Sequence, residues 1–329
     1  MNVSFQLRDG VRIAGMRFGN MTSKQKAICL HGWLDNSASF KSLAAHIANI
    51  MDFDIVAIDH VGHGHSSHKP HAPFLDYIAH AREVIIQLGF DQTKMHIIGH
   101  SMGTAVGLML AGSYPELTKS IVCIDGFGPV VKKEEDAAAI LRKSLDGRHD
   151  PNPRGIKPKE YESIHVAVEA RMRAVKSYPG NQTISDFAAR TIVERATEPF
   201  HPPPSSSSSV KFRHDPSLFL PSPTYATEGM ARSFINAICC PTLLLQASSG
   251  WPPSDPTAME ERMKIMQDKD LLEYHLLQSS HHLHLDPESS GEVNKRVETF
   301  LRRIRDDDSE EGRETKRQRK KDLDPDDIP

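Results

Sequence analysis

The strongest chemical signal is a pentapeptide centred on a serine. Residues 99–103 read Gly-His-Ser-Met-Gly and match G-x-S-x-G, the pattern of a nucleophile elbow in which a strand turns directly into a helix. The turn crowds the backbone, so its flanks favour glycine and its strained centre exposes the side chain. The apolar run Met95–Ile98 predicts the strand, and Met102–Ala111 predicts the helix, which disfavours a chance Gly-Ser-Gly turn. Ser101 is therefore the candidate nucleophile, and serine favours an acyl-enzyme route.

An acyl-transfer site also needs backbone N–H donors for the developing oxyanion. Met102, which follows the nucleophile, is one candidate. The second candidate is Trp33, in the sequence His31-Gly-Trp33 after the expected strand Ala27–Leu30. Its indole would wall the pocket, although a simple core role for Trp33 is equally compatible with the N–H role.

A serine nucleophile needs a general base, and the chain has 18 histidines. The elbow pattern is followed in chain order by an acid and then a histidine, which selects the segment after the last strand. His281 is the candidate base, His282 is its main competitor, and His284 is expected to pack or bond structurally. Clustered histidines raise the alternative of a metal site, but no recognised ligand spacing accompanies them, so no metal and no cofactor are expected.

The carboxylate that orients the base is expected at a strand end that borders the loop containing His281. The turn after the strand Thr242–Gln246 is the usual place, yet it contains no carboxylate before Asp255. Asp125 ends the neighbouring strand Ile121–Ile124 and is our candidate, with Asp255 as the alternative. A turn-stabilising role before Gly126 is the competing interpretation of Asp125. Asp59 ends another strand and is expected to fix its own turn by hydrogen bonds.

The elements that must position these residues alternate between strand and helix, which indicates an α/β fold with a mostly parallel, doubly wound sheet. A hairpin opens the chain, with its turn at Asp9–Gly10. Residues 1–129 and 237–304 are expected to form the core. Residues 130–236 carry helical patterns without a convincing strand and predict a helical cap, with a Pro/Ser-rich loop at 202–209. Residues 305–329 are nearly all charged and predict a disordered tail.

The composition of the chain limits the kinds of partner and the cellular location to expect. A formal net charge of −3 gives no reason to expect nucleic acid, and no apolar run has the length of a membrane span. Cys29 and Cys123 lie in apolar runs, so reduced core thiols and an intracellular, mainly cytoplasmic location are expected. The tail cluster Lys316–Lys321 leaves nuclear import as an alternative. The oligomeric state is left open.

The chain resembles the serine hydrolase-like protein family, in the haloalkane-dehalogenase-like branch of the α/β hydrolases. The resemblance rests on five motifs and covers about residues 3–303. The motifs lie at 31–36 (HGWLDN), 62–68 (GHGHSSH), 99–103 (GHSMG), 212–216 (FRHDP) and 281–285 (HHLHL). It implies an α/β-hydrolase core, a helical cap, and Ser101, Asp125 and His281 as the triad. The Pro/Ser stretch and the charged tail depart from the family pattern.

The expected function is hydrolysis of a small-molecule carboxylic ester with a small or medium acyl group, through an acyl-enzyme on Ser101. The same triad would serve C–C or amide hydrolysis, and the sequence does not separate these reactions. A catalytically silent member of the fold that binds a ligand through its cap is the alternative from a different class.

Overall fold

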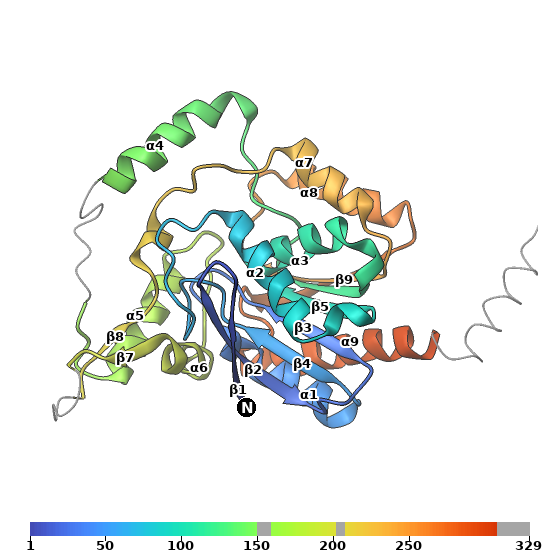
Figure 1. Ribbon diagram of the computed structural model, residues 1–329, viewed down its shortest axis with the longest axis horizontal. Coiled ribbons are helices and arrows are strands. Elements are labelled where there is room, and N and C mark those ends of the chain that lie inside the picture. Colours follow the sequence, from blue (N-terminus) through green and yellow to red (C-terminus); the bar gives the residue numbers. More distant parts are fainter. Residues whose placement is uncertain (150–158, 202–207, 308–329) are drawn as a thin grey trace, which may run out of the picture.

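The computed structural model describes residues 1–149, 159–201 and 208–307. Its centre is one eight-stranded sheet with the spatial order β1-β2-β4-β3-β5-β6-β9-β10 (Figure 1). The strands are β1 (Asn2–Gln6), β2 (Arg12–Gly19), β3 (Lys26–Leu30), β4 (Asp54–Ile58), β5 (Met95–His100), β6 (Thr118–Ile124), β9 (Thr242–Ser249) and β10 (Leu272–Ser280). β2 runs antiparallel to both neighbours, and the remaining pairs are parallel. The predicted doubly wound α/β fold is thus confirmed.

Helices cover both faces of the sheet. Side chains of α1 and α9 pack in the core on one face, and side chains of α2, α3, α7 and α8 pack on the other. The bounds are α1 (Lys41–Ile50), α2 (Phe74–Gln87), α3 (Met102–Ser113), α7 (Glu228–Ala237), α8 (Pro256–Gln267) and α9 (Pro287–Asp307). The central strands are buried along their whole length, as expected for parallel strands with helices on both sides.

The carboxyl ends of the parallel strands share one edge of the sheet. Ser101 follows β5, Asp125 follows β6 and His281 follows β10. The pairing His100↔Ile124 sets Ser101 and Asp125 beside each other at that edge. The topology therefore collects residues from distant parts of the sequence.

The chain between β6 and β9 forms an insertion, part of which lies beside the sheet. It contains α4 (Ala137–His149), α5 (Ile164–Lys176), α6 (Asp186–Ala196), β7 (Thr197–Pro199), β8 (Val210–Phe212) and α7. α5, α6, β7 and β8 lie together beside the sheet, and side chains of α5, α6 and β8 share a small apolar core (Figure 1). Leu285, which lies in the loop between β10 and α9, belongs to the same core and joins this part of the insertion to the sheet edge that carries Ser101, Asp125 and His281.

Two expectations about this insertion differ from the structure. The expected absence of strands is wrong, because β7 and β8 pair antiparallel on either side of the Pro/Ser stretch. Three-residue strands are too short to show an alternating pattern. The expected boundary at residue 236 falls inside α7, which packs against α3 and α8 in the layer that covers the sheet.

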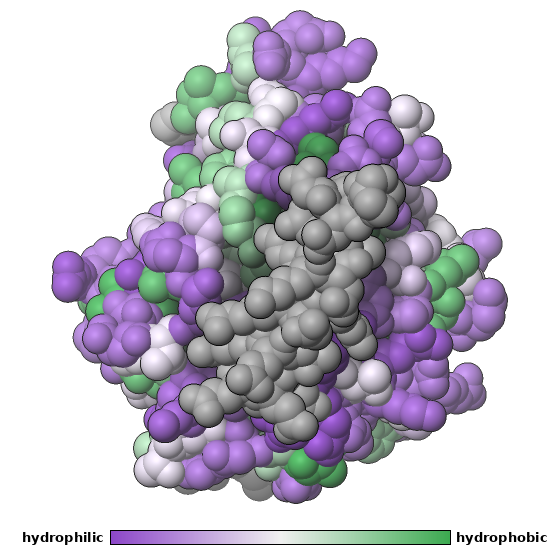
Figure 2. All heavy atoms as spheres, turned by 90° about the vertical axis from the view of Figure 1, so that its right-hand side faces the viewer, coloured by the Kyte–Doolittle hydropathy of each residue, from purple (hydrophilic) through white to green (hydrophobic). Residues whose placement is uncertain are grey.

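The ends of the chain and the low-complexity stretch are only partly described. Residues 305–307 continue α9, while the rest of the expected tail, with the cluster Lys316–Lys321, lies outside the described residues, as do 202–207. Hydrophilic residues predominate among the described residues on the face that Figure 2 shows. Within the described chain, no helix combines the length and apolar character needed to cross a membrane.

Candidate active site

Ser101 lies at the sharp turn between β5 and α3. Its backbone has φ 51° and ψ −117°, a positive-φ conformation that is costly for any residue other than glycine. Its amide donates to the Ile124 carbonyl at 2.9 Å, which fixes the turn against β6. A Cβ at Gly103 would collide with the Leu30 carbonyl, so α3 needs a glycine there to approach the sheet. The predicted strand, turn and helix all occur at this position.

Asp125 and His281 meet beside this turn. Asp125 Oδ2 lies 2.5 Å from His281 Nδ1, and both side chains are buried. The carboxylate also accepts the Ala247 N–H at 2.9 Å and the Trp251 N–H at 3.1 Å. A Cβ at Gly250 would collide with the same carboxylate. The end of β9 and the turn after it, which lack an acid of their own at this point, therefore hold the carboxylate that follows β6.

Electrostatics favour a neutral His281. Burial lowers its pKa, and the hydrogen bond with Asp125 opposes this without reversing it. Because the carboxylate accepts the Nδ1 proton, the neutral imidazole keeps Nε2 free of a proton. A neutral imidazole held in that tautomer has the properties of a general base.

The two alternative residues lie elsewhere. Asp255 is the N-cap of α8, where its carboxylate accepts the Ala258 N–H at 3.1 Å. His282 is buried next to Asp35, with 3.3 Å between His282 Nε2 and Asp35 Oδ1. Burial lowers the pKa of His282 to about 4 although Asp35 favours its charged form. The structure brings neither residue to the Asp125–His281 pair as a substitute partner.

His100, which precedes the nucleophile, connects the elbow to the histidine loop. Its Nε2 lies 3.0 Å from the His281 carbonyl and donates to it, and its Nδ1 lies 3.2 Å from Asp35 Oδ2. Its ring also packs against that of His284, with centroids 4.3 Å apart. The backbone of the candidate base is thus tied directly to the turn that carries Ser101.

The buried carboxylate of Asp35 joins these histidines to the insertion. Asp35 Oδ1 accepts from Arg171 of α5 at 2.8 Å. Burial opposes ionisation of Asp35, but His282, His100 and Arg171 outweigh it and hold its pKa well below the ordinary value. Asp35 is therefore charged, and it links the loop after β3, the elbow and α5.

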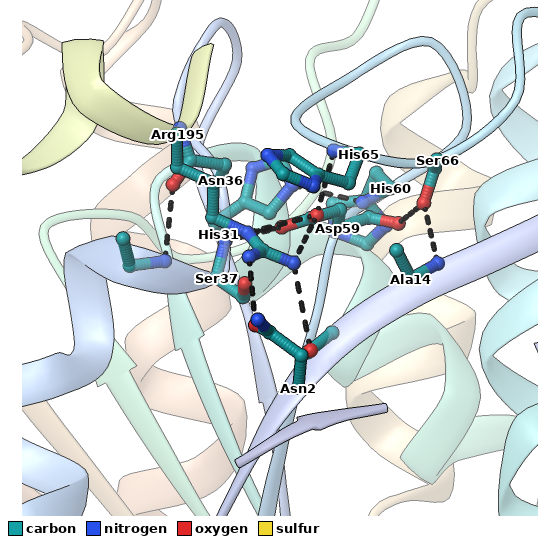
Figure 3. A network of polar contacts seen from close by, with 12 residues as sticks. Asn2, Ala14, His31, Asn36, Ser37, Asp59, His60, His65, Ser66 and Arg195 are labelled. Atoms are coloured by element: carbon teal, nitrogen blue, oxygen red, sulfur yellow. Dashed lines mark hydrogen bonds and ion pairs between the residues drawn. The ribbon is translucent and has the colours of Figure 1, made fainter. Parts of the chain in front are cut away.

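A second buried carboxylate repeats this arrangement (Figure 3). Asp59 accepts the Ser37 and His65 N–H groups, each at 2.8 Å, and so fixes the turn after β4 as predicted. Arg195 points from α6 toward Asp59, with 2.8 Å between Nη2 and Oδ2 (Figure 3). Sequence reasoning missed Arg195 and Arg171, since no local pattern marks a partner in another layer.

The two candidate oxyanion donors flank the elbow. Met102 is the first residue of α3, so its N–H has no acceptor within the helix. Trp33 follows Gly32, where an added Cβ would lie 3.1 Å from Ser101 Cβ. The loop after β3 thus passes directly over the nucleophile.

A cavity of about 780 Å³ opens beside this loop and is called here the cap cavity. Its volume is typical of a small-molecule site. Trp33, Leu34, Ser66 and His68 of the core line it, together with residues of the insertion between Lys159 and Phe219. Among the described residues, no group of three or more His, Cys, Asp or Glu is arranged to hold a metal ion.

Comparisons agree with this architecture. Residues 28–251 match the family model described as "alpha/beta hydrolase fold". A serine hydrolase-like protein from Dictyostelium discoideum is 31% identical over 300 residues, which cover 88% of this chain and 78% of that protein. A crystal structure of a hypothetical protein from Pseudomonas aeruginosa PAO1 is 32% identical, has a TM-score of 0.77, and covers 91% of this chain and 99% of that one.

A thioesterase domain from the curacin biosynthetic pathway has a TM-score of 0.73 at 18% identity, with 92% of this chain and 98% of that domain covered, and shares the fold. The family model spans most of the chain, and the Dictyostelium relative matches it over most of both lengths. The chain therefore belongs to the α/β-hydrolase superfamily, among the serine hydrolase-like proteins.

Proposed function

We propose that this protein is a serine hydrolase that cleaves a carboxylic ester with a small or medium acyl group. The observation that carries the proposal is the buried 2.5 Å contact between Asp125 and His281 at the same sheet edge as Ser101. The strained backbone of Ser101 also supports the proposal, because residues with such strained backbone conformations cluster at active sites.

The proposed reaction proceeds through an acyl-enzyme. His281 Nε2 takes the Ser101 Oγ proton as the oxygen attacks the ester carbonyl, and Asp125 stabilises the imidazolium that forms. The Met102 and Trp33 N–H groups hold the oxyanion. His281 returns the proton to the departing alcohol and then activates a water molecule, which releases the acid and restores Ser101.

Substitution of the nucleophile tests the proposal. Ser101→Ala should lower kcat/KM for p-nitrophenyl butyrate by about 10⁴-fold or more, as loss of a triad serine does elsewhere. Ser113→Ala is the matched control, because Ser113 ends the same helix and is exposed. A fluorophosphonate probe should label the wild type and the control but not Ser101→Ala. Wild-type protein that neither turns over the ester nor takes the label would contradict the proposal and favour a silent binding protein.

A further inference from the structure

The cap cavity has a charge pattern that the proposed mechanism does not use. We infer that it receives an acyl chain ending in a carboxylate, and that Lys211 and Arg213 bind this carboxylate. The inference rests on the proposed esterase function and names its substrate class, a monoester of a dicarboxylic acid.

The cavity begins at the candidate oxyanion donor. Trp33 lines it, and Gly32 before it is in close approach to Ser101. On the side of His281, by contrast, the Trp251 ring neighbours both the base and the cavity residue Tyr178, with centroids 6.1 Å from His281 and 5.5 Å from Tyr178. The alcohol departs on the side of the base that protonates it. The cavity is therefore assigned to the acyl group.

The wall next to Trp33 is aromatic. Phe219 packs edge-on against Trp33 with centroids 5.5 Å apart, and His214 packs against Phe219 at 5.3 Å. Burial lowers the pKa of His214 to about 4, so this ring is neutral at pH 7. Such a wall suits a methylene chain, because it offers contact area without a charge near the ester.

Positive charge gathers at the insertion side of the cavity. Lys159, Lys211 and Arg213 line it, and Glu198 is the one acidic residue in the described lining. A fourth cation in the lining, Arg171, is already neutralised by Asp35. Three cations face one carboxylate, so the lining carries a surplus of positive charge.

The pairing of Glu198 is loose. Its carboxylate lies 3.4 Å from Lys211 Nζ and 3.8 Å from Arg213 Nη2, beyond the 2.7–2.9 Å usual for charge-assisted hydrogen bonds. Lys211 belongs to β8 and Arg213 directly follows that strand, and both cations approach the same Glu198 carboxylate. His68 Nε2 donates to the Arg213 carbonyl at 2.6 Å and holds the backbone at this point. Because Glu198 does not saturate Lys211 and Arg213, these two cations can also bind the carboxylate of a substrate.

The motif at 212–216, which the catalytic proposal leaves without a role, lies in this part of the cavity. Phe212, Arg213, His214 and Pro216 all line it. Arg213 would therefore act as a binding residue for the acyl terminus, at a distance from the reacting ester.

A matched pair of esters tests the inference. Mono-p-nitrophenyl adipate carries a terminal carboxylate, and methyl p-nitrophenyl adipate is its neutral counterpart. The wild type should prefer the anionic ester in kcat/KM. Arg213→Gln and Lys211→Gln should each lower kcat/KM for that ester about five- to tenfold, mainly through KM, and should affect the neutral ester less, so that the preference for the anionic ester falls. Glu198→Gln should act in the opposite direction, because it removes the competing carboxylate.

Charge-matched controls come from the exposed face of α5. Lys176→Gln and Arg173→Gln remove exposed cations of the insertion that do not line the cavity, and both should leave the preference unchanged. Equal turnover of the two esters by the wild type, or equal effects of Arg213→Gln on both, would overturn the inference while the esterase proposal stands.

A binding measurement separates this inference from the catalytic proposal. Calorimetry with Ser101→Ala protein should show monomethyl adipate binding more tightly than dimethyl adipate, and the added Arg213→Gln change should remove the difference. This result is expected whether or not the wild type hydrolyses p-nitrophenyl esters. Equal affinity for the two adipates would overturn the inference directly.

Discussion

In the proposed mechanism, Asp125 combines a structural and a chemical role in one side chain. Its two oxygens accept one backbone N–H group from the end of β9 and one from the turn after it, and one oxygen also meets the His281 imidazole. The backbone donors fix the carboxylate in place before any substrate binds. Orientation of the imidazole by such a fixed acid is what sets the tautomer of a catalytic histidine.

Asparagine substitutions distinguish the two candidate acids. Asp125→Asn should lower kcat for p-nitrophenyl butyrate by about 10³–10⁴-fold, because an amide neither holds the Nδ1–H tautomer nor stabilises the imidazolium. Asp255→Asn should leave kcat within about twofold, because asparagine caps a helix as well as aspartate does. Urea unfolding of both variants checks that the fold is kept. Near-normal turnover by Asp125→Asn would rule out its role as the triad acid.

Individual site residues were predictable from the sequence where a local pattern marks them. Ser101 is marked by its flanking glycines, and Asp125 by its place at a strand end. The link between Asp35 and Arg171 was not predictable in this way. These residues are 136 positions apart, and their contact depends on how α5 docks on the core.

The elements of the insertion are held to the core by buried ion pairs as well as by apolar packing. α5 contributes Arg171 to Asp35, and α6 contributes Arg195 to Asp59. Removing one partner of a buried pair leaves a charge without compensation, which is more costly than losing an exposed pair. The docking of both helices should therefore be sensitive to single arginine changes.

Two arginines of α6 provide a matched comparison. Arg195→Met should lower the free energy of unfolding by about 3 kcal/mol, because Asp59 stays buried and charged without its cation. Arg190→Met should change it by less than about 0.5 kcal/mol, because the Arg190–Asp186 pair is solvent-exposed. Urea denaturation measures both values. Similar small losses in the two variants would show that the Asp59 pair does not anchor α6.

Element prediction succeeded where periodicity extends over many residues and failed where it does not. The hairpin, the parallel strands and the helices on the sheet lie close to their expected positions. β7 and β8 have three residues each and show no usable period. α9 begins at Pro287, because proline suits the first position of a helix.

Over the whole molecule, buried histidines set the pH response of stability. Burial lowers the pKa of His63 and His96 to about 3, and that of His282 and His214 to about 4. In the unfolded chain a histidine titrates near 6.5. Below that pH the unfolded state binds more protons than the folded state, so stability is fully present above pH 6.5 and is lost as the pH falls.

The free energy of unfolding should therefore decrease steadily from pH 6.5 to pH 4.5, by up to about 1.4 kcal/mol per pH unit for each such histidine. The buried carboxylates of Asp35 and Asp59 do not contribute in this window. The pKa values of Asp35 and Asp59 are lowered, so their stabilisation is lost only below the unfolded value near 3.9. Urea unfolding at pH 7.5, 6.5, 5.5 and 4.5 measures the slope.

Substitutions of one buried and one exposed histidine test whether burial of histidines causes this loss of stability. His96→Gln should reduce the slope by about 1.4 kcal/mol per pH unit, because His96 is buried between strands and stays neutral when folded. His165→Gln should leave the slope unchanged, since His165 is exposed on α5. An unfolding free energy that stays constant down to pH 4.5, or equal effects of the two substitutions, would show that the buried histidines do not control acid stability.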